Sequence, residues 1–557
     1  MLKRHTALLV NAFSSIFSVG ALFSILAVTA CVQPQPYPLS LSSQTLEQDI
    51  ESPEYREVLA TMIPTDLAAE WLRVATPDNY HVFLATHGGH GAIEKDPELK
   101  KAYERRQRIA TGYLEVVRGA YDEKKVKPPF DDEATLRGVL ESVDAKSVRR
   151  PLPNVKVEVI LTAPGAEKQW PCLRGPSRQG HVFDARMPRA WSATDNVVWR
   201  SELPGRGNSS PVVWDDRLWV TAEVPGETVG RVLLCFDRRN GEELWRLEAP
   251  APKEQEQLYW KNTYASSTPV TDGKRVIAFF GSAGLLCASV TGEQLWHVDL
   301  GSFTTMHGTG TTPVLYKDLL IVVQDQTNNP SLFAAFDKKT GEERWRHERP
   351  RGACWASPVL LRVEGRDELL YNGSNHIVSY DPLTGEELWR SAGTSREAVP
   401  MVVTGGGLLY SASGRNGPIL AIRPGGDGDV TESHRVWGKR RGGPHVPSPL
   451  YHDDRLYIIS DTGILNCLDA ASGESLWQAR LRGRFSAGPF VVGSTLVFLN
   501  EDGVSYLLKA GDAFELLGQN DLGEYTVATP AVLGGRMYFR TEKALVCVGD
   551  DGGGRQE

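Results

Sequence analysis

The cysteines are the side chains of this chain best able to do chemistry, and they are widely spaced. Seven are present, but the sequence contains no CxxC pair and no two adjacent cysteines. A paired-thiol redox centre or a cysteine zinc site therefore has no local scaffold. No GxSxG, P-loop or HExxH pattern occurs either, so no activated nucleophile or metal hydrolase is indicated.

Three histidines, His81, His87 and His90, surround an HGGH stretch and are the nearest approach to a metal-ligand cluster. No carboxylate or cysteine stands beside them at ligand spacing, and a zinc site needs three or four ligands. We interpret them as loop or helix-cap residues. The sequence thus predicts no catalytic residue, no cofactor-binding residue and no metal site.

A repeat dominates the rest of the chain. Copies of DxxTGExxW, such as DPLTGEELW at 381–389, recur about 40 to 50 residues apart, which is the length of a four-stranded propeller blade. Asp and Thr side chains stabilise a turn by bonding to nearby backbone, and glycine supplies the positive φ that reverses the chain. A copy with an enlarged turn spans 423–437, and one without tryptophan spans 509–517.

Apolar strands that start with a small residue and a proline precede the turns, and eight such starts are present. The last strand group ends without a tryptophan strand, whereas NVVWRSELPGRG at 196–207 is an outer strand with no blade of its own. We therefore predict an all-β main domain over 196–549, an eight-bladed β-propeller closed by this N-terminal outer strand. Its first strands begin near residues 209, 267, 311, 357, 399, 448, 488 and 529.

Each repeat tryptophan begins an outer strand and can bury its indole against the neighbouring blade. Cysteines stand where other copies carry small residues, as Cys235 and Cys467 do at the position of Ala335 and Ser379, so we interpret them as core residues. The predicted blade-docking residues are Trp199, Trp245, Trp296, Trp345, Trp389, Trp437 and Trp477.

Polar and aromatic residues next to the predicted inner strands would line the central channel. They could simply bond to one another, or they could hold a small molecule or a partner peptide. The candidate channel site consists of Lys261, Asn262, Tyr264, His307, Trp355, Arg440, Arg441 and His445.

The DxxTGExxW copies with their SPV-type strand starts resemble the pyrroloquinoline-quinone-type propeller repeat. Quinoprotein alcohol dehydrogenases share this repeat with the lipoprotein subunit of the outer-membrane β-barrel assembly machinery. Stretches such as WPCLRGPSRQG and RGGPHVPSPL are similar to uncharacterised exported propeller proteins of planctomycete-type bacteria. The resemblance covers about residues 170–549 and implies the fold more strongly than the function.

Resemblance to the quinoprotein dehydrogenases implies a particular cofactor site. In that family a quinone lies between a tryptophan and a ring made by two adjacent cysteines, with a bound calcium and an Asp base beside it. This chain has no adjacent cysteines, although Trp355 or a channel Asp is a conceivable substitute. Pyrroloquinoline quinone and calcium are therefore expected only under an alternative hypothesis, and the main hypothesis has no cofactor.

The N-terminus predicts export. Lys3, Arg4 and His5 precede an apolar run over about 7–30, and the run ends in LAVTAC at Cys31. This ending resembles a bacterial lipobox, which implies cleavage before Cys31 and lipid attachment there. An ordinary cleaved signal and an uncleaved membrane anchor are the alternatives, since about 20 apolar residues span a bilayer.

The other segments differ in composition from the propeller. Residues 32–48 predict a flexible linker, 49–150 a small α-helical domain with apolar residues three and four apart, 151–195 a connecting segment and 550–557 a tail. The net charge of −8 is spread without a basic block, which argues against nucleic-acid binding.

Two functional hypotheses follow. The first is a non-catalytic, monomeric propeller that binds protein partners, is lipid-anchored to the cell envelope and faces the periplasm, with a role in outer-membrane protein assembly. The alternative is a periplasmic quinoprotein dehydrogenase or a small-molecule-binding propeller that uses the channel.

Overall fold

The computed structural model of the protein describes residues 97, 100–101, 155–183, 186–327 and 330–549. Every described strand belongs to the unit Arg149–Glu557. The predicted leader, linker and tail lie outside the described residues, as does the predicted helical domain except for its three described positions, which are helical. Within the described residues, no helix is long and apolar enough to cross a bilayer.

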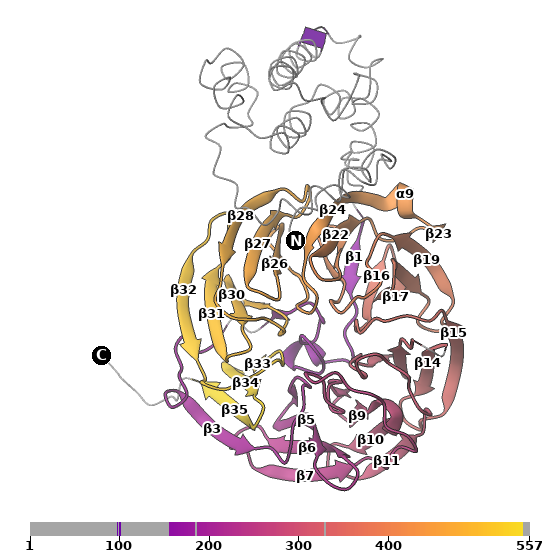
Figure 1. Ribbon diagram of the computed structural model, residues 1–557, viewed down its shortest axis with the longest axis vertical. Coiled ribbons are helices and arrows are strands. Elements are labelled where there is room, and N and C mark those ends of the chain that lie inside the picture. The colour runs from indigo at the N-terminus through magenta and orange to yellow at the C-terminus, as the bar shows by residue number, and fades with distance from the viewer. Residues whose placement is uncertain (1–96, 98–99, 102–154, 184–185, 328–329, 550–557) are drawn as a thin grey trace, which may run out of the picture. The chain divides into compact units, whose positions relative to one another are not determined.

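The described strands form eight sheets around a central axis, which confirms the predicted eight-bladed propeller (Figure 1). Each blade is an antiparallel meander whose first strand is innermost. Blades 1 to 4 contain β4 (Val212–Trp214), β5 (Arg217–Val224), β6 (Gly230–Asp237) and β7 (Glu243–Glu248); β8 (Val270–Thr271), β9 (Arg275–Phe279), β10 (Leu285–Ser289) and β11 (Gln294–Val298); β12 (Val314–Tyr316), β13 (Leu319–Gln324), β14 (Ser331–Asp337) and β15 (Glu343–Arg349); and β16 (Val359–Val363), β17 (Arg366–Asn372), β18 (His376–Tyr380) and β19 (Glu387–Ala392).

The second half of the ring repeats this order. Blades 5 to 8 contain β20 (Val403–Gly405), β21 (Leu408–Ala412), β22 (Gly417–Ile422) and β24 (Arg435–Gly443); β25 (Leu450–His452), β26 (Arg455–Ile459), β27 (Ile464–Asp469) and β28 (Ser475–Arg480); β29 (Phe490–Val492), β30 (Thr495–Leu499), β31 (Val504–Lys509) and β32 (Leu516–Asp521); and β33 (Ala531–Leu533), β34 (Arg536–Arg540), β35 (Ala544–Gly549) and β3 (Val197–Glu202). The remaining elements are β1 (Val157–Val159), β2 (His181–Val182), β23 (Gly428–Asp429), the short helix α9 (Thr431–His434) and the 3-10 turns Ala166–Lys168 and Gly281–Ala283.

The ring closes as the sequence predicts. β3 pairs antiparallel with β35, so that Trp199 faces Cys547 and Glu202 faces Ala544. In Figure 1 the magenta β3 lies beside the yellow β35 at the outside of blade 8. Segments from opposite ends of the propeller therefore share one sheet, and β35 is not left as the outer edge of the last blade.

The hydrophobic core lies between the blades. Every residue of β14 is buried, whereas the outer strand β7 alternates between half-buried and exposed residues. The inner strands thus pack on both faces, and their apolar residues form clusters with the neighbouring blade, as Phe279 of blade 2 does with Phe336 of blade 3. Each blade is consequently stable only with its neighbours in place.

The repeat tryptophans lie over the turn of the next blade. Trp199 Nε1 donates to the Arg238 carbonyl (3.0 Å), and a Cβ on Gly241 would stand 2.5 Å from the Trp199 ring. Gly241 also has φ of +77°, so glycine is required here both for conformation and for room. The same two contacts join Trp245 to Val290 and Gly292, Trp296 to Lys338 and Gly341, and Trp437 to Ala470 and Gly473.

Two tryptophans each make one of these two interactions, either the hydrogen bond or the stacking on glycine. Trp477 donates to the Gly511 carbonyl (3.0 Å), but no atom lies within 4 Å of a Cβ built on Gly511. Trp345 lies over Gly385, whose added Cβ would be 2.7 Å from the ring, and its Nε1 has no acceptor among the described residues. The stacking and the hydrogen bond are therefore separable parts of the junction.

The junction between blades 4 and 5 is built differently. Trp389 is fully buried and donates to Glu368 Oε2 (2.8 Å) within its own blade. The enlarged turn of blade 5 forms β23, which pairs parallel with β19 so that Trp389 faces Gly428. A backbone pairing thus replaces the indole-on-glycine contact at this position.

The turn itself is held by the residues that define the repeat. Asp337 Oδ1 accepts from the Lys339 amide (2.8 Å), and the Gly341 amide donates to the Asp337 carbonyl (2.8 Å). Thr340 Oγ1 accepts from the Glu342 amide (3.3 Å). These bonds satisfy backbone groups that the turn leaves without partners in the sheet.

Residues 155–183, the hub segment, run through the middle of the ring, where Figure 1 draws them in purple. β1 pairs with β16 of blade 4, and β2 pairs in parallel with β29 of blade 7. Trp170 exchanges two backbone hydrogen bonds with Val213 in β4, and the Thr271 amide of blade 2 donates to the Pro171 carbonyl (3.1 Å). The sequence predicted a connecting segment over 151–195 and did not predict these contacts with the blades.

Two buried arginines of the hub segment bond to backbone carbonyls at the starts of inner strands. Arg174 Nη2 donates to Pro449 (2.8 Å) and Pro489 (3.2 Å), before the first strands of blades 6 and 7. Arg178 Nη2 donates to Pro313 (2.9 Å) before that of blade 3. Buried carbonyls need donors, and apart from the short pairings of β1 and β2 the inner edges of the blades have no further strand to supply them. The hub arginines are such donors.

The hub segment reaches seven blades in total, because Gln179 Oε1 also accepts from the Thr404 amide of blade 5 (2.9 Å). Arg174 is only 1% exposed, and burial lowers its pKa to about 9, so it still carries its charge at neutral pH. A buried charge is costly unless it is well hydrogen-bonded. Nη2 of Arg174 supplies such bonds, whereas Nε and Nη1 have no acceptor among the described residues, so the bonds offset only part of this cost.

Replacing Trp199 with alanine should destabilise the ring by about 3–5 kcal/mol, the usual loss for a buried aromatic side chain. Chemical denaturation monitored by tryptophan fluorescence and circular dichroism measures this loss. Trp260→Ala is the control, since Trp260 is 73% exposed and its removal should leave the midpoint unchanged. Equal effects of the two substitutions would contradict the closure role of Trp199.

Replacing Arg174 with alanine should lower the free energy of unfolding by about 2–4 kcal/mol, because it leaves inner-strand carbonyls buried without donors. The exposed Lys168 in the same segment gives a matched control, and Lys168→Ala should change stability by less than about 0.5 kcal/mol. A neutral Arg174→Ala variant would show that the hub segment does not stabilise the ring.

Candidate functional site

The two faces of the propeller carry different connections. We call the loop face the side with the connections from the fourth strand of one blade to the first strand of the next. The turn face carries the Asp/Thr/Gly turns and the first hairpin of each blade. The hub segment contacts the turn face, because Gln169 bonds to Asp215 in the first hairpin of blade 1 (2.9 Å) and the Lys156 amide donates to Glu364 in that of blade 4 (2.6 Å).

Six of the eight predicted channel residues lie on connections of the loop face. These connections come from four different blades, so the residues meet only in the folded ring. Lys261, Asn262 and Tyr264 lie in 249–269, His307 in 299–313, Trp355 in 350–358 and His445 in 444–449.

Aromatic rings form a continuous run on this face. His307 stacks on Trp355 with ring centroids 5.4 Å apart and planes at 22°, and Tyr259 lies 5.1 Å from His307 on the other side. Trp260 extends the run, 5.5 Å from Tyr259. The sequence interpretation missed Tyr259 and Trp260, although two adjacent aromatics in a long polar connection were a signal.

Lys261 ties its connection to a distant blade. Its Nζ lies 2.5 Å from Glu501 Oε1 and 3.3 Å from Ser486 Oγ, both in the region of blade 7. Ser486 also donates to the same carboxylate oxygen (2.7 Å). The 249–269 connection thus reaches past blade 8, and Lys261 serves primarily as a structural tether in this arrangement.

Asn262 and Tyr264 are also used internally. Asn262 Nδ2 donates to the carbonyls of His307 (2.7 Å) and Thr309 (3.2 Å), which joins two connections. Tyr264 donates to the Glu256 carbonyl (3.2 Å), and burial raises the pKa of its phenol. The hydrogen-bonding groups of these two residues therefore support the loops.

His445 faces the same region from blade 5. Its amide donates to Asp461 Oδ2 (2.7 Å), and burial lowers the pKa of its imidazole, so the ring is neutral at pH 7. Nδ1 of this ring is buried without a partner among the described residues. The neutral ring contributes a polar edge beside the aromatic run.

Arg440 and Arg441 do not lie at the channel mouth, contrary to the prediction. Both are exposed and belong to β24, the outermost strand of blade 5. β24 extends past a bulge until Gly443 pairs with Gly417, so the loop that the sequence indicated begins only afterwards. These two residues are separate from the other six.

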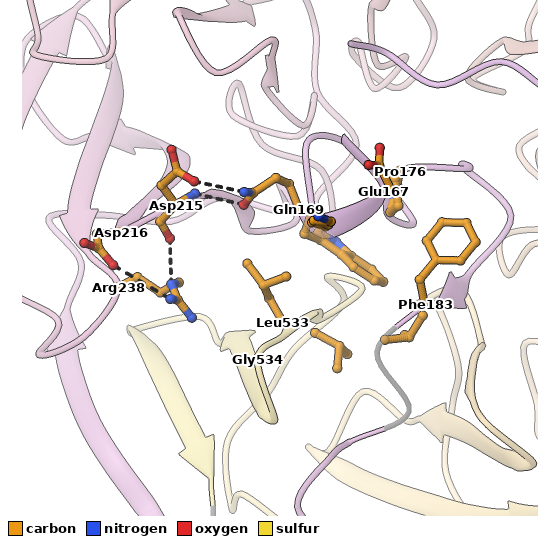
Figure 2. A pocket seen from close by; sticks show the side chains of 13 residues that line it. Glu167, Gln169, Pro176, Phe183, Asp215, Asp216, Arg238, Leu533 and Gly534 are labelled. Carbon is orange, nitrogen blue, oxygen red and sulfur yellow. Dashed lines mark hydrogen bonds and ion pairs between the residues drawn. The ribbon is translucent and has the colours of Figure 1, made fainter. Parts of the chain in front are cut away.

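The turn face carries a cavity of about 740 Å³ beside the hub segment (Figure 2). Phe183 and Leu533 form an apolar side, and Gln169, Asp215 and Arg238 lie on the polar side. Gln169 exchanges two hydrogen bonds with Asp215, and Arg238 Nε donates to the Asp215 carbonyl (2.7 Å). These polar groups are hydrogen-bonded to one another, so their arrangement does not indicate a catalytic group in this cavity.

The described residues do not fit the quinone and calcium that the fold resemblance implies. None of their six cysteines forms a disulfide, and all six are buried. Trp355 stacks on His307 and donates to the Gly308 carbonyl (2.7 Å), so one ring face is occupied by the chain itself. No group of three or more His, Cys, Asp or Glu residues in the described part could hold a metal ion.

The family profile described as Outer membrane protein assembly factor BamB matches residues 174–257, 229–428 and 373–516. These matches together span more than half of the chain and cover most of the propeller. The chain belongs to this family. The BamB family assignment agrees with the repeat, the eight blades and the resemblance inferred from the sequence.

Individual BamB relatives are distant. The chain is 23% identical over 361 residues to Outer membrane protein assembly factor BamB of Burkholderia pseudomallei, covering 62% of this chain and 85% of the relative. It is 24% identical over 351 residues to the Bordetella pertussis protein of the same name, covering 60% and 81%. A quinohemoprotein alcohol dehydrogenase from Comamonas testosteroni has a similar fold, with TM-score 0.50, 14% identity, and 70% and 82% of the two chains covered. That likeness concerns the fold alone.

Breaking the Lys261 tether should loosen the 249–269 connection without unfolding the ring. A partly buried ion pair of this kind contributes about 1 kcal/mol, so Lys261→Met should speed amide hydrogen exchange in this connection about fivefold. Mass spectrometry of exchanged peptides measures the change. Lys253→Met is the control. Lys253 lies in the same connection, but its side chain is 87% exposed and its ion pair with Asp299 is long, at 3.6 Å, so its loss should change exchange little. Unchanged exchange in Lys261→Met would contradict the tether.

Proposed function

We propose that this chain is a non-catalytic β-propeller that binds protein partners during outer-membrane protein assembly at the cell envelope. The observation that carries the proposal is the BamB family match across residues 174–516. Two relatives named as outer-membrane assembly factors support it at 23% and 24% identity. The partners would be other proteins of the assembly machinery.

The loop face supplies a surface suited to such binding. Tyr259 is 43% exposed and Met306 45% exposed, and both stand next to the stacked His307. Aromatic and methionine side chains are enriched at protein interfaces, and a few of them carry most of the binding energy. Because the nearby Asn262 and Trp355 side chains already donate to backbone carbonyls of the protein, this patch can bury apolar area on a partner without losing those contacts.

The proposal includes attachment to the envelope through Cys31, which lies outside the described residues. The lipobox-like sequence before Cys31 supports a lipid anchor, and the linker over 32–48 would give the propeller reach from the membrane surface. Radiolabelled palmitate incorporation into the wild type, but not into Cys31→Ser, would support this part of the proposal.

Removing both exposed side chains in Tyr259→Ala/Met306→Ala should reduce recovery of β-barrel assembly components about tenfold, since hot-spot residues each contribute more than about 1 kcal/mol. The measurement is affinity purification from detergent-solubilised envelopes, quantified by mass spectrometry. Leu383→Ala is the matched control, because Leu383 is an equally exposed apolar residue, at 50%, in a turn of the opposite face.

Wild type and Leu383→Ala should recover the same components in equal amounts. Recovery of no assembly component by the wild-type protein would refute the proposed role. Equal recovery by all three proteins would place the binding surface elsewhere and refute the part of the proposal that concerns the loop face.

A further inference from the structure

Six exposed arginines lie on the loop face of blades 5 and 6. They come from the connection into blade 5 (393–402), the β21–β22 hairpin, the end of β24, the end of β28 and the connection out of blade 6 (481–489). The β21–β22 hairpin belongs to the loop face because successive strands of a blade run in opposite directions. We call this group the arginine rim, and it consists of Arg396, Arg415, Arg441, Arg480, Arg482 and Arg484.

The side chains of the arginine rim have no ion-pair or hydrogen-bond partner among the described residues. Arginines exposed on the outer strands of other blades are paired, since Arg246 contacts Glu243 at 2.6 Å and Arg390 contacts Glu387 at 2.5 Å. Both of these acids stand three positions before their arginine, and no rim arginine has an acid at that position. The charge of the rim therefore does not serve to hold the described fold together.

Hydrogen bonds hold the segments of the rim in blade 5 side by side. The connection with Arg396 is joined to the β21–β22 hairpin by a bond from the Ser395 amide to Ser413 Oγ (2.9 Å). The same hairpin accepts, through Asn416 Oδ1, from the Gly442 amide near the end of β24 (2.9 Å). Three rim arginines are thus carried on segments that are bonded to one another, so a partner meets them as one surface.

Asp461 connects this surface to the three arginines of blade 6. Its carboxylate accepts from the amides of His445 (2.7 Å) and Val446 (3.1 Å), which follow β24. Its carbonyl accepts from the Phe485 amide (3.1 Å), directly after the last rim arginine. The carboxylate of Asp461 is therefore used by the backbone and does not neutralise a guanidinium of the rim.

The charge of this part of the loop face is opposite in sign to that of the whole chain. Residues 393–402, 413–416, 439–449, 460–463 and 480–489 contain eight Lys or Arg residues and two acidic ones, Glu397 and Asp461, an excess of six positive charges (eight minus two). The full chain has a net charge of −8. A local field of one sign attracts ligands of the other sign, so the rim favours an anionic partner.

The surroundings of the rim favour a protein anion over a bilayer. Surfaces that bind a bilayer place apolar side chains among their basic ones, so that acyl chains and headgroups are both engaged. None of the large hydrophobic side chains exposed in the described residues lies in the five segments listed above. Arginine pairs with carboxylates through a planar two-donor edge, which the Asp and Glu side chains of a polypeptide can supply in series.

We propose that the arginine rim binds an acidic segment of a protein partner, whose Asp and Glu carboxylates pair with the guanidinium groups. This inference rests on the proposed function for the partner being a protein, and it adds the chemistry that the partner must present. The rim is separate from the patch of Tyr259 and Met306, which lies on the connections out of blades 1 and 2.

Fluorescence anisotropy tests the proposal with the full chain, purified in a non-ionic detergent, and a labelled acidic peptide, (Glu-Ser)8. The peptide should bind, and its affinity should fall at least about fivefold when the salt concentration rises from about 0.05 M to about 0.3 M, because exposed charges are screened. The neutral peptide (Gln-Ser)8 should not bind. Absence of binding by the acidic peptide at low salt would overturn the proposal, as would equal binding of the two peptides.

Two triple variants with the same loss of charge locate the binding. Arg396→Gln/Arg415→Gln/Arg441→Gln should weaken the acidic peptide at least about tenfold, since three exposed ion pairs are lost. The matched control, Arg246→Gln/Arg346→Gln/Arg390→Gln, removes three exposed arginines of outer strands and should stay within about twofold of the wild type. Equal weakening in both variants would overturn the proposal, because the peptide would then respond to net charge and not to the rim.

Vesicles of phosphatidylcholine with phosphatidylglycerol provide the competing anionic surface. The wild type and the rim variant should bind these vesicles equally weakly in a sedimentation assay. Strong binding that is lost in the rim variant would assign the rim to lipid headgroups and overturn the proposal. The peptide assay needs no assembly component, so its failure refutes the rim alone, whereas failure of the affinity purification described above refutes the role in assembly.

Discussion

The ring depends on one contact, an indole laid over a glycine. Trp199 covers Gly241 and donates to a carbonyl of the same turn, and the pattern recurs at other junctions. A side chain at the glycine would strike the ring, and the backbone there has positive φ, so the pair cannot be exchanged one residue at a time. The Asp and Thr of the repeat fix the turn on which the indole rests, and the last junction uses the same contact to join the two ends of the propeller.

The features predictable from the sequence were those that repeat. The spacing of the turns gave the blade length, and the unpaired strand around Trp199 indicated how the ring closes, because a missing strand at one end and a surplus strand at the other must pair. The repeat also indicated which segments connect the blades, and six of the eight candidate channel residues lie on such connections. Their position relative to each inner strand is a property of the repeat, even though each comes from a different connection.

The remainder was not predictable because it depends on single, long-range contacts. Arg174 and Arg178 bond to backbone carbonyls, which look the same at every residue, and they lie in a stretch without periodicity. Lys261 meets a carboxylate 240 positions away in the chain. Arg440 and Arg441 were misplaced because the strand of blade 5 extends past its bulge, and no residue type marks that extension.

The junction between blades 4 and 5 shows how such an array can change. There Trp389 has turned to Glu368, and the backbone of β23 pairs with β19 in its place. A Cβ added to Gly428 would meet no atom within 4 Å, so the turn of blade 5 needs no room for an indole, although its glycines still have positive φ. In evolutionary terms, the turn of blade 5 is a place where insertions can be tolerated. Such insertions can create new surface while the junctions between the other blades keep the ring closed.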